Sequence, residues 1–258
     1  MNAPQPKIRI RGLAKSFGEK RVLDGVDLDV PAGTSMVVIG GSGSGKSVLI
    51  KCVLGLIEPD AGRIEIDGVD VLSLGPRRRR ALTARIGMLF QNGALFDSLP
   101  VWENVAFGLL ARKMLRRAEA HARAGEILGQ LGLAASVGEL FPAELSGGMQ
   151  KRVALARAIA ATPDVLFFDE PTTGLDPIMG AVIDGLILDC VKRLGSTAVA
   201  ITHDMASAQR IGDAAAMLHG GKIVWNGPAA SLLESGNPVV DQFTHGRRDG
   251  PIRMELRA

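Results

Sequence analysis

A glycine-rich stretch, GGSGSGKS from Gly40 to Ser47, restricts the possible folds of this 258-residue chain more than any other segment. It fits the pattern G-x-x-x-x-G-K-[ST], with an apolar run before it and a helix-like run after it. In such a loop, backbone N–H groups point inward at phosphate oxygens, and the N-terminus of the next helix adds positive potential. The predicted nucleotide-binding residues of this loop are Gly40, Gly41, Ser42, Gly43, Ser44, Gly45, Lys46 and Ser47.

Two side chains of this loop are expected to act on the nucleotide directly. Lys46 is predicted to reach the β- and γ-phosphates, and Ser47 to hold Mg²⁺. The alternative, a flexible Gly/Ser turn, is disfavoured because the loop lies between a strand pattern and a helix pattern, as the motif requires.

The composition, with 47% hydrophobic and 22% charged residues, indicates a folded globular protein. No apolar run approaches the roughly 18 residues that a membrane span needs, and the sequence MNAPQPKIRIRG lacks the apolar core of a signal peptide. The sequence therefore predicts a soluble chain in the cytoplasm. Cys52 and Cys190 lack a C-x-x-C partner, so they are interpreted as small buried hydrophobic residues.

One basic run, Arg77 to Arg80, interrupts an otherwise mildly charged chain of net charge +3. It could meet nucleic acid or anionic lipid headgroups. A solvated helix face is the favoured interpretation because no aromatic residues alternate with the arginines, as a base-stacking surface would require. No nucleic-acid partner is predicted.

The N-terminal part shows strand patterns at residues 7–11 and at Val22 to Val30, joined by a predicted turn KSFGEKR that carries Phe17. Phe17 is interpreted either as an ordinary packing residue or as a platform for an adenine ring. Near the other end, residues 214–227 are expected to form two strands around Gly220-Gly221, and residues 228–244 a helix.

Polar residues follow three apolar runs that are typical of buried strands. Gln91 follows residues 86–90, Asp169 and Glu170 follow residues 165–168, and His203 follows residues 199–202. Two carboxylates at the end of a buried strand are costly unless a cation or a reacting water uses them. Asp169 is therefore expected to orient Mg²⁺, and Glu170 to take a proton from the attacking water.

From Asn92 to about Ala161 the pattern becomes helical. One apolar face is predicted for a helix in this segment, formed by Met114, Ala118, Ala122, Gly125, Leu128 and Leu131. The segment ends in LSGGMQ, where Ser146, Gly147 and Gly148 open a second helix with an anion-binding N-terminus.

The order GGSGSGKS, Gln91, LSGGMQ, VLFFDE, GLDP and His203 resembles the nucleotide-binding subunit of ATP-binding-cassette (ABC) transporters over nearly all of residues 7–235. The resemblance implies an α/β fold. It comprises a P-loop NTPase (RecA-like) core with a mixed sheet, an N-terminal antiparallel β subdomain and an inserted α-helical signature subdomain. The ATPase domain is expected at 1–236, with its core at 1–91 and 162–236 and the helical part at about 92–161, followed by an extension at 237–258.

The same resemblance implies a head-to-tail homodimer with two ATP molecules at its interface. Each ATP would be held by the P-loop of one subunit and, in trans, by Ser146, Gly147 and Gly148 of the other. Gln91 would sense Mg²⁺ and water while coupling to the membrane partner, Asp176 would lie across the dimer interface, and His203 would contact the γ-phosphate.

Three further segments, LFQNGALFDSLPVWENVAF, FPAELSGGMQKRVALARA and QFTHGRRDGPI, look like the ATPase of the Mla (MCE-associated) lipid-transport systems of Gram-negative bacteria. This narrower resemblance implies an integral-membrane permease and an MCE-type lipid-binding protein as partners. It also implies phospholipid transport between the inner and outer membranes, and a peripheral place on the cytoplasmic face of the inner membrane. In that family the tail suggests a dimer contact, here through Phe243, although the sequence departs from the family pattern after Pro251. A loose, frayed terminus is the alternative for this tail.

Three alternatives stay open beside it. The chain could serve another ABC importer or exporter, of an amino acid or a hydrophobic compound. It could be a soluble ABC protein acting on DNA or ribosomes, although it lacks the coiled-coil insertions, zinc-binding cysteines or second cassette typical of that class. It could also bind ATP without turnover, but the presence of Glu170 and His203 argues against this.

Overall fold

The computed structural model describes residues 5–253, which form two compact units. The first unit is Met1–Gly75 with Val199–Ala258, and the second is Pro76–Ala198. Residues 1–4 of the predicted ATPase domain and 254–258 of the predicted extension lie outside the described residues. None of the described helices combines the length and apolar character that crossing a membrane requires.

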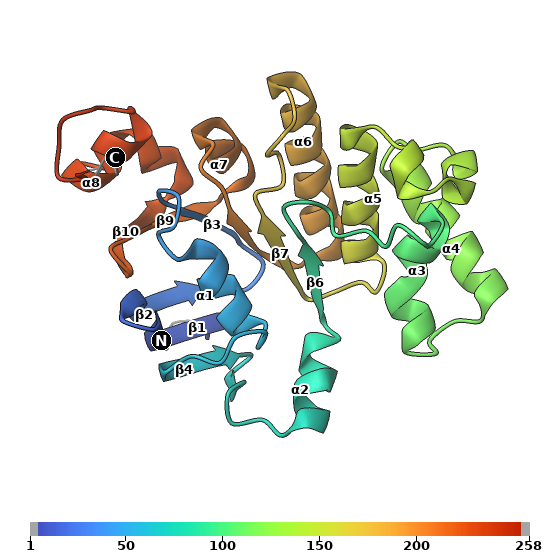
Figure 1. The fold of residues 1–258 in the computed structure, drawn as a ribbon, viewed down its shortest axis with the longest axis horizontal. Coiled ribbons are helices and arrows are strands. Elements are labelled where there is room, and N and C mark those ends of the chain that lie inside the picture. Colours follow the sequence, from blue (N-terminus) through green and yellow to red (C-terminus); the bar gives the residue numbers. More distant parts are fainter. Residues whose placement is uncertain (1–4, 254–258) are drawn as a thin grey trace. The chain divides into compact units, whose positions relative to one another are not determined.

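An antiparallel sheet with the strand order β2-β1-β4-β5 forms one part of the first unit (Figure 1). In its register, Ile8 of β1 lies opposite Val30 of β2 and Ile66 of β4, and all three side chains are buried. β1 continues through Phe17, so the predicted turn KSFGEKR is shorter than expected and leaves Gly18 and Glu19 between the strands. The strands of this sheet are β1 (Ile8–Phe17), β2 (Lys20–Val30), β4 (Ala61–Ile66) and β5 (Val69–Asp70).

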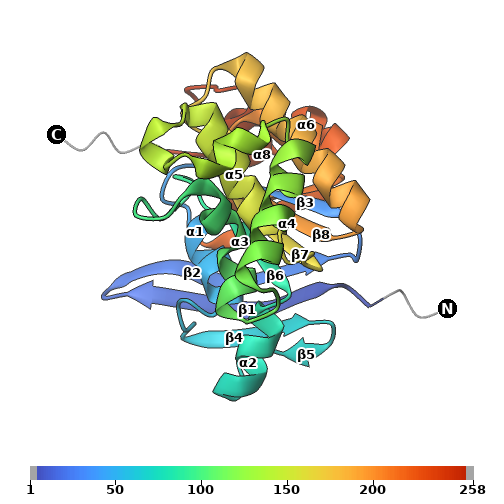
Figure 2. The same ribbon diagram turned by 90° about the vertical axis from the view of Figure 1, so that its right-hand side faces the viewer.

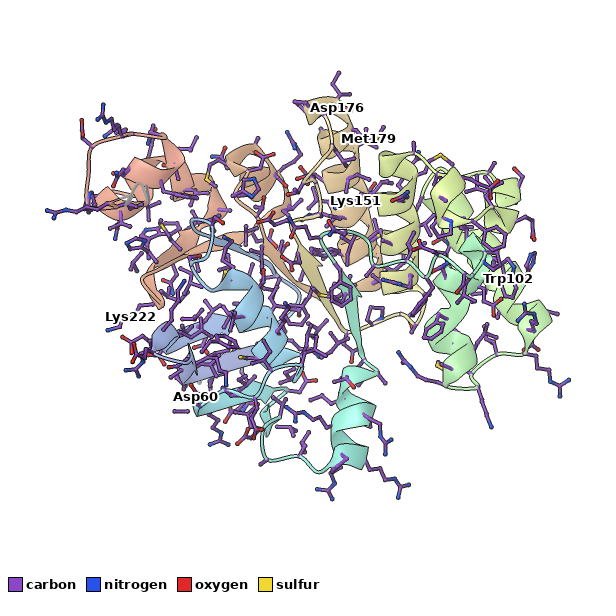
Figure 3. All side chains as sticks on the ribbon, in the orientation of Figure 1. Asp60, Trp102, Lys151, Asp176, Met179 and Lys222 are labelled. Atoms are coloured by element: carbon purple, nitrogen blue, oxygen red, sulfur yellow. The ribbon has the colours of Figure 1, made fainter. Side chains whose placement is uncertain are left out.

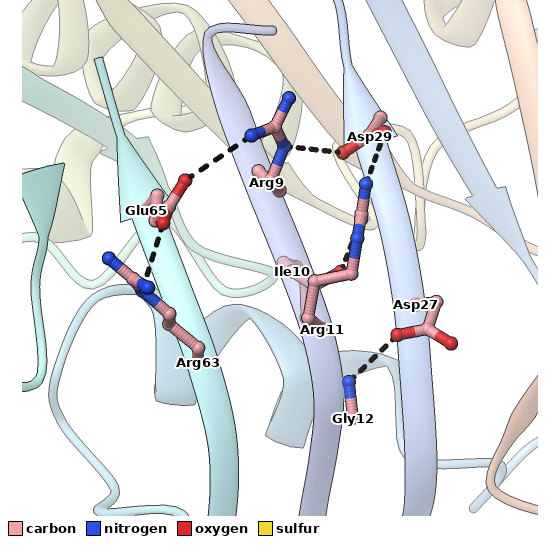
Figure 4. A network of polar contacts seen from close by, with 8 residues as sticks. All are labelled: Arg9, Ile10, Arg11, Gly12, Asp27, Asp29, Arg63 and Glu65. Carbon is pink, nitrogen blue, oxygen red and sulfur yellow. Dashed lines mark hydrogen bonds and ion pairs between the residues drawn. The ribbon is translucent and has the colours of Figure 1, made fainter. Parts of the chain in front are cut away.

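The face of this sheet opposite the buried side chains of Ile8, Val30 and Ile66 carries ion pairs (Figure 4). Arg11 Nη2 lies 2.6 Å from Asp29 Oδ2, and Arg63 Nε lies 2.8 Å from Glu65 Oε1. The hydrogen bond to Asp29 raises the pKa of the Arg11 guanidinium. Because Arg11, Asp29 and Arg63 are largely exposed, these pairs contribute little to stability and mark this face as solvated.

The second sheet is six-stranded, and its strands in the first unit follow the order β10-β9-β3-β8. β3 (Ser35–Ile39) is buried along its whole length and pairs in parallel with β9 (Ala214–His219), as expected for a strand covered on both faces. β9 and β10 (Lys222–Pro228) form the predicted hairpin around Gly220-Gly221. The remaining elements are α1 (Lys46–Val53), α7 (Met205–Ile211), η3 (Ala229–Glu234) and α8 (Pro238–Thr244).

In the second unit the strand order is β8-β7-β6, and β8 (Thr197–Ile201) ends in the first unit. β6 (Ile86–Leu89) and β7 (Val165–Asp169) are parallel, with Ile86 opposite Val165. The arginine run lies on α2 (Pro76–Thr83), none of whose residues is buried, as expected for an exposed helix face.

The segment between β6 and β7 is helical from Val101 onward, and residues 91–100 form turns rather than the predicted helix. It contains α3 (Val101–Ala111), α4 (Arg117–Gln130), η1 (Ala135–Glu139), η2 (Pro142–Glu144) and α5 (Gly147–Ile159), and α6 (Pro177–Leu194) follows β7. α3, α4 and α5 contact one another (Figure 2).

The predicted apolar face of the helix in this segment was only partly right: Leu128 and Leu131 are buried as predicted, but Met114 is exposed. Ala118 and Ala122 are exposed, and the buried face of α4 consists of Ala120, Ala124, Ile127 and Leu128. Alanines occur at alternate positions in this sequence, so both faces match helical spacing and the pattern does not distinguish them.

The chain after β10 folds back on itself around one glutamine. Gln242 of α8 is buried, and its amide nitrogen donates to the carbonyls of Arg247, Arg248 and Ile252, while its oxygen accepts from Ile252 N at 2.6 Å. Val240 is fully buried and Phe243 is partly exposed. Residues 238–252 therefore have a defined conformation.

Candidate functional site

The glycine-rich loop connects β3 to α1. At two of its positions there is no room for the Cβ atom of any other residue. A Cβ on Gly40 would lie 2.3 Å from Leu218 O, and one on Gly45 would lie 3.0 Å from Val22 O. Both residues also have positive φ angles, 154° and 105°. The backbone is therefore curled against neighbouring strands, as a phosphate cradle requires.

Two polar side chains of the loop, those of Lys46 and Ser44, are turned toward its interior, whereas Ser42 is exposed. The buried Lys46 ammonium donates to Gly40 O at 2.7 Å and to Gly41 O at 3.0 Å. Ser44 Oγ is buried without a hydrogen-bond partner in the described residues. A buried cation beside curled backbone and an unsatisfied hydroxyl fit the phosphates of a nucleotide, so this geometry supports the predicted roles of the loop.

His203 lies at the same edge of the first unit's sheet as this loop. His203 follows β8 directly after Thr202. Thr202 N donates to Val38 O of β3 at 3.4 Å, and Val38 lies two residues before Gly40. Phe17 ends β1 with 49% of its surface exposed, and Lys15 Nζ lies 5.6 Å from its ring centroid. An aromatic ring this exposed is available for stacking, which leaves the adenine interpretation of Phe17 in place.

In the second unit, the end of β7 brings two predicted residues together. Glu170 Oε2 accepts from Gln91 Nε2 at 3.2 Å, and it also accepts from Thr173 Oγ1 at 3.0 Å. Glu170 has a φ of 47°, which is uncommon for a residue other than glycine. Asp169, the last residue of β7, is buried. The carboxylate of Glu170 is thus held in place by two donors beside the buried Asp169, as a positioned base requires.

Ser146 caps α5, as the sequence predicted, and its hydroxyl accepts from Met149 N at 3.4 Å. Gly148 faces Met179 of α6, because a Cβ on Gly148 would lie 3.1 Å from the thioether sulfur. Met179 and Asp176 are labelled on α6 in Figure 3. Asp176 caps α6 by accepting from Ile178 N and Met179 N, both at 3.0 Å. This local role was not predicted, although Asp followed by Pro before an apolar run is a helix-start signal.

Lys151 and Thr173 are the residues near Glu170 that the sequence analysis missed. Lys151 is 7% exposed, and its ammonium donates to Gln91 O. Burial lowers the pKa of the Lys151 ammonium, while the carboxylates of Glu170 and Asp169 oppose that shift. No sequence signal identified this lysine, because a lysine in a basic helix is usually solvated.

The described residues contain no cluster of three His, Cys, Asp or Glu side chains that could hold a metal ion by themselves. The predicted Mg²⁺ ligands, Ser47, Gln91 and Asp169, supply one hydroxyl, one amide and one carboxylate. Hydroxyl, amide and carboxylate oxygens are donor types that Mg²⁺ accepts, with water and substrate phosphates completing its shell; Ser47 lies in the first unit, and Gln91 and Asp169 lie in the second.

Two hollows lie in the second unit near Gln91. The smaller, about 210 Å³, is lined by Gln91, Gly147, Lys151 and Thr173 among others. The larger, about 450 Å³, is lined mainly by apolar side chains, among them Met88, Phe96, Val105, Phe107 and Leu109, together with Arg112. We call this larger hollow the phenylalanine groove, because Phe96 is 42% and Phe107 41% exposed and their ring centroids lie 4.5 Å apart.

Comparison with known proteins gives consistent matches. Residues 23–173 match the family model described as ABC transporter. The chain is 40% identical over 96% of its length to the probable ribonucleotide transport ATP-binding protein mkl of Mycobacterium leprae, covering 71% of that protein. It is 38% identical over 97% of its length to the intermembrane phospholipid transport system ATP-binding protein MlaF of Escherichia coli K12, covering 93% of it.

Solved structures match as well. The dimeric, post-hydrolysis structure of the ATP-binding cassette MJ0796 bound to ADP and Pi is 30% identical, with a TM-score of 0.79. The match covers 86% of this chain and 98% of that chain.

Proposed function

This chain belongs to the ABC transporter family and is an ATPase, and we propose that it powers phospholipid transport between two membranes. The observation that carries the proposal is the 38% identity to MlaF over nearly the full length of both chains. It is supported by the three segments that resemble the Mla ATPase, which include the end of the tail that Gln242 organises.

For hydrolysis we propose the roles that the sequence predicted. Lys46 neutralises charge on the β- and γ-phosphates, His203 contacts the γ-phosphate, and Phe17 stacks on adenine. Ser47 and Gln91, with Asp169 acting through a water molecule, would hold Mg²⁺, and the ion would supply charge neutralisation at the phosphates. Glu170 takes the proton of the attacking water, and Gln91 and Thr173 orient its carboxylate.

We also propose that two copies form a head-to-tail dimer in which Ser146, Gly147 and Gly148 contact the nucleotide of the other subunit. The exposed residues that follow Asp176 support this. Ile178 is 79% and Val182 46% exposed on the same side of α6, and apolar side chains this accessible are typical of a contact surface. We propose that the tail adds to this dimer through the partly exposed Phe243.

The membrane permease is proposed to dock at the phenylalanine groove. Exposed aromatic rings beside a hollow are typical of an interaction site, and the groove is lined by Phe96, five residues after Gln91. Docking there would place the permease next to the segment that contacts Glu170. An MCE-type lipid-binding protein is the third proposed component, with this subunit on the cytoplasmic face of the inner membrane.

A second candidate function rests on the 40% identity to mkl, a protein named for ribonucleotide transport. The two candidates differ in the chemistry of the transported molecule. A phospholipid is amphipathic and partitions into bilayers, whereas a ribonucleotide is charged and water-soluble.

The test is to purify the chain with its permease, reconstitute the complex in liposomes, and add Mg-ATP. We expect ATP-dependent movement of a fluorescent phospholipid and stimulation of hydrolysis by phospholipid, with neither effect from ribonucleoside monophosphates. The control is the same complex carrying Lys46→Ala. Stimulation by ribonucleotides without lipid movement would favour the second candidate and contradict the first.

A further inference from the structure

The segment that carries Gln91 is held against α5 by a row of three side chains. Lys151, Ala154 and Arg157 are spaced three apart, so they follow one another along one side of the helix. Gly93 lies over the middle of this row, because the Cβ that it lacks would be 3.5 Å from Ala154 Cβ. We call this row, Lys151, Ala154 and Arg157, the α5 clamp.

Both cations of the clamp hold backbone carbonyls of the segment 91–94. Lys151 Nζ donates to Gln91 O. Arg157 donates to Gly93 O and to Ala94 O, each at 2.7 Å. The segment has an unusual conformation at these positions, since Gly93 has a φ of 69° and Ala94 a φ of 50°. Without the two cations, three carbonyls of a strained segment would lose their donors.

The two cations of the clamp have different neighbours. Lys151 is in the second turn of α5, close to the capping residue Ser146, and it is attracted by the carboxylates of Glu170 and Asp169. Arg157 is near the C-terminal end of α5, and its guanidinium lies 6.0 Å from the ring centroid of Phe96. The clamp therefore connects the capped end of α5, the carbonyl of Gln91 and the aromatic wall of the phenylalanine groove.

We propose that Lys151 and Arg157 are positioning residues for ATP hydrolysis, which fix the main chain of 91–94 to α5 and so set where Gln91 presents its amide to Glu170. The inference rests on the proposed roles of Gln91 and Glu170. It adds that α5 and the segment 91–94 move as one body. A displacement of the Ser146 end of α5 is then passed to Gln91 through Lys151.

The test is a double-mutant cycle in the purified subunit. Lys151→Met keeps the length of the side chain but removes its charge and donor. We expect kcat to fall roughly 10- to 100-fold, in line with the cost of misplacing a catalytic group by about 1 Å, while the KM for ATP stays within about twofold. Lys151→Arg restores a cationic donor and should recover part of the loss. Lys192→Met, at an exposed position of α6, is the matched control.

The decisive comparison is made in the Gln91→Ala background. If Lys151 acts through Gln91, Lys151→Met should lower kcat by no more than about twofold there, because the group that it positions is already gone. Losses that multiply would overturn the inference, since Lys151 would then act on Glu170 by charge or on the fold as a whole. Arg157→Met provides the same cycle independently if Lys151→Met does not fold.

Two outcomes separate this inference from the site on which it rests. If Gln91→Ala and Glu170→Gln both leave kcat unchanged, the proposed catalytic roles fail, and the inference fails with them. If both lower kcat but the cycle is additive, only the clamp fails. Hydrogen exchange supplies a readout without turnover. The Gly93 amide, which donates to Phe90 O at 2.8 Å, should exchange at least about tenfold faster in both clamp variants but not in Lys192→Met.

Discussion

Replacing Gly40 with alanine tests the claim that the phosphate loop is curled against β9. The added Cβ would lie 2.3 Å from Leu218 O and 2.9 Å from Ser44 Oγ. Ordinary van der Waals contact begins at about 3.4 Å, so the new methyl group overlaps a backbone atom by about 1 Å. A backbone carbonyl in a buried strand cannot rotate away as a side chain would, and the loop must therefore shift.

The expected cost combines two terms. Overpacking that forces a backbone shift costs about 1–3 kcal/mol, and a non-glycine residue at positive φ costs about 1 kcal/mol or more. The sum of about 2–4 kcal/mol should lower Tm by about 5–15 °C for a domain of this size. ATP binding should weaken in parallel, because the shifted loop no longer directs its N–H groups at the phosphates. Calorimetry and equilibrium binding of ATP measure both effects.

Gly41→Ala is the matched control for stability. It lies next to Gly40 in the same loop, but nothing stands within 4 Å of its added Cβ. Its Tm should stay within about 2 °C of that of the parent, as is usual for a substitution without strain. If the Gly40 and Gly41 variants have the same Tm and bind ATP equally well, the curled loop is not under the steric restraint described above.

Three further predictions follow from the same structure. Lys46→Ala removes a charge-assisted donor and should weaken ATP binding roughly 10- to 100-fold by equilibrium titration; unchanged affinity would contradict its role. Burial raises the pKa of the Cys52 thiol from 9.0 to about 11, so at pH 9 only about 1% is thiolate. Its alkylation should then be at least about 50-fold slower in the native protein than in guanidinium and should accelerate as the pH rises; equal rates would refute its burial. Truncation after Gly236 should raise the dissociation constant of the dimer roughly tenfold, because burial of a phenylalanine is worth ~1.5–3 kcal/mol. Analytical ultracentrifugation measures this constant, and an unchanged value would exclude the tail contact.

Much of the fold followed from local chemistry in the sequence. The glycines of the phosphate loop, the buried strand before Asp169 and the hairpin around Gly220 were predicted, because each depends on backbone freedom or on burial on both faces of a sheet. Burial of Cys52 and Cys190 was predicted because both lie in apolar helical runs without a C-x-x-C partner, and it is confirmed.

Other features of the structure depend on which helices and strands pack against one another. The periodicity of apolar residues in the sequence does not contain this information. The buried face of α4 was misplaced because alanine has the same pattern on either face. Lys151 was missed because its partner, the carbonyl of Gln91, is 60 residues away in the sequence. The fold-back of the tail onto Gln242 likewise depends on contacts between residues that show no periodic pattern.

The most direct test of the account is the ATPase activity of Glu170→Gln beside the parent, with bound nucleotide identified after rapid isolation. Glutamine keeps the shape of the side chain and can still contact Gln91 and Thr173, but it cannot accept the proton of the attacking water. A positioned general base contributes ~10²- to 10⁴-fold. We therefore predict that turnover falls by about that factor while the variant retains bound, uncleaved ATP. Hydrolysis within about threefold of the parent would show that Glu170 is not the base.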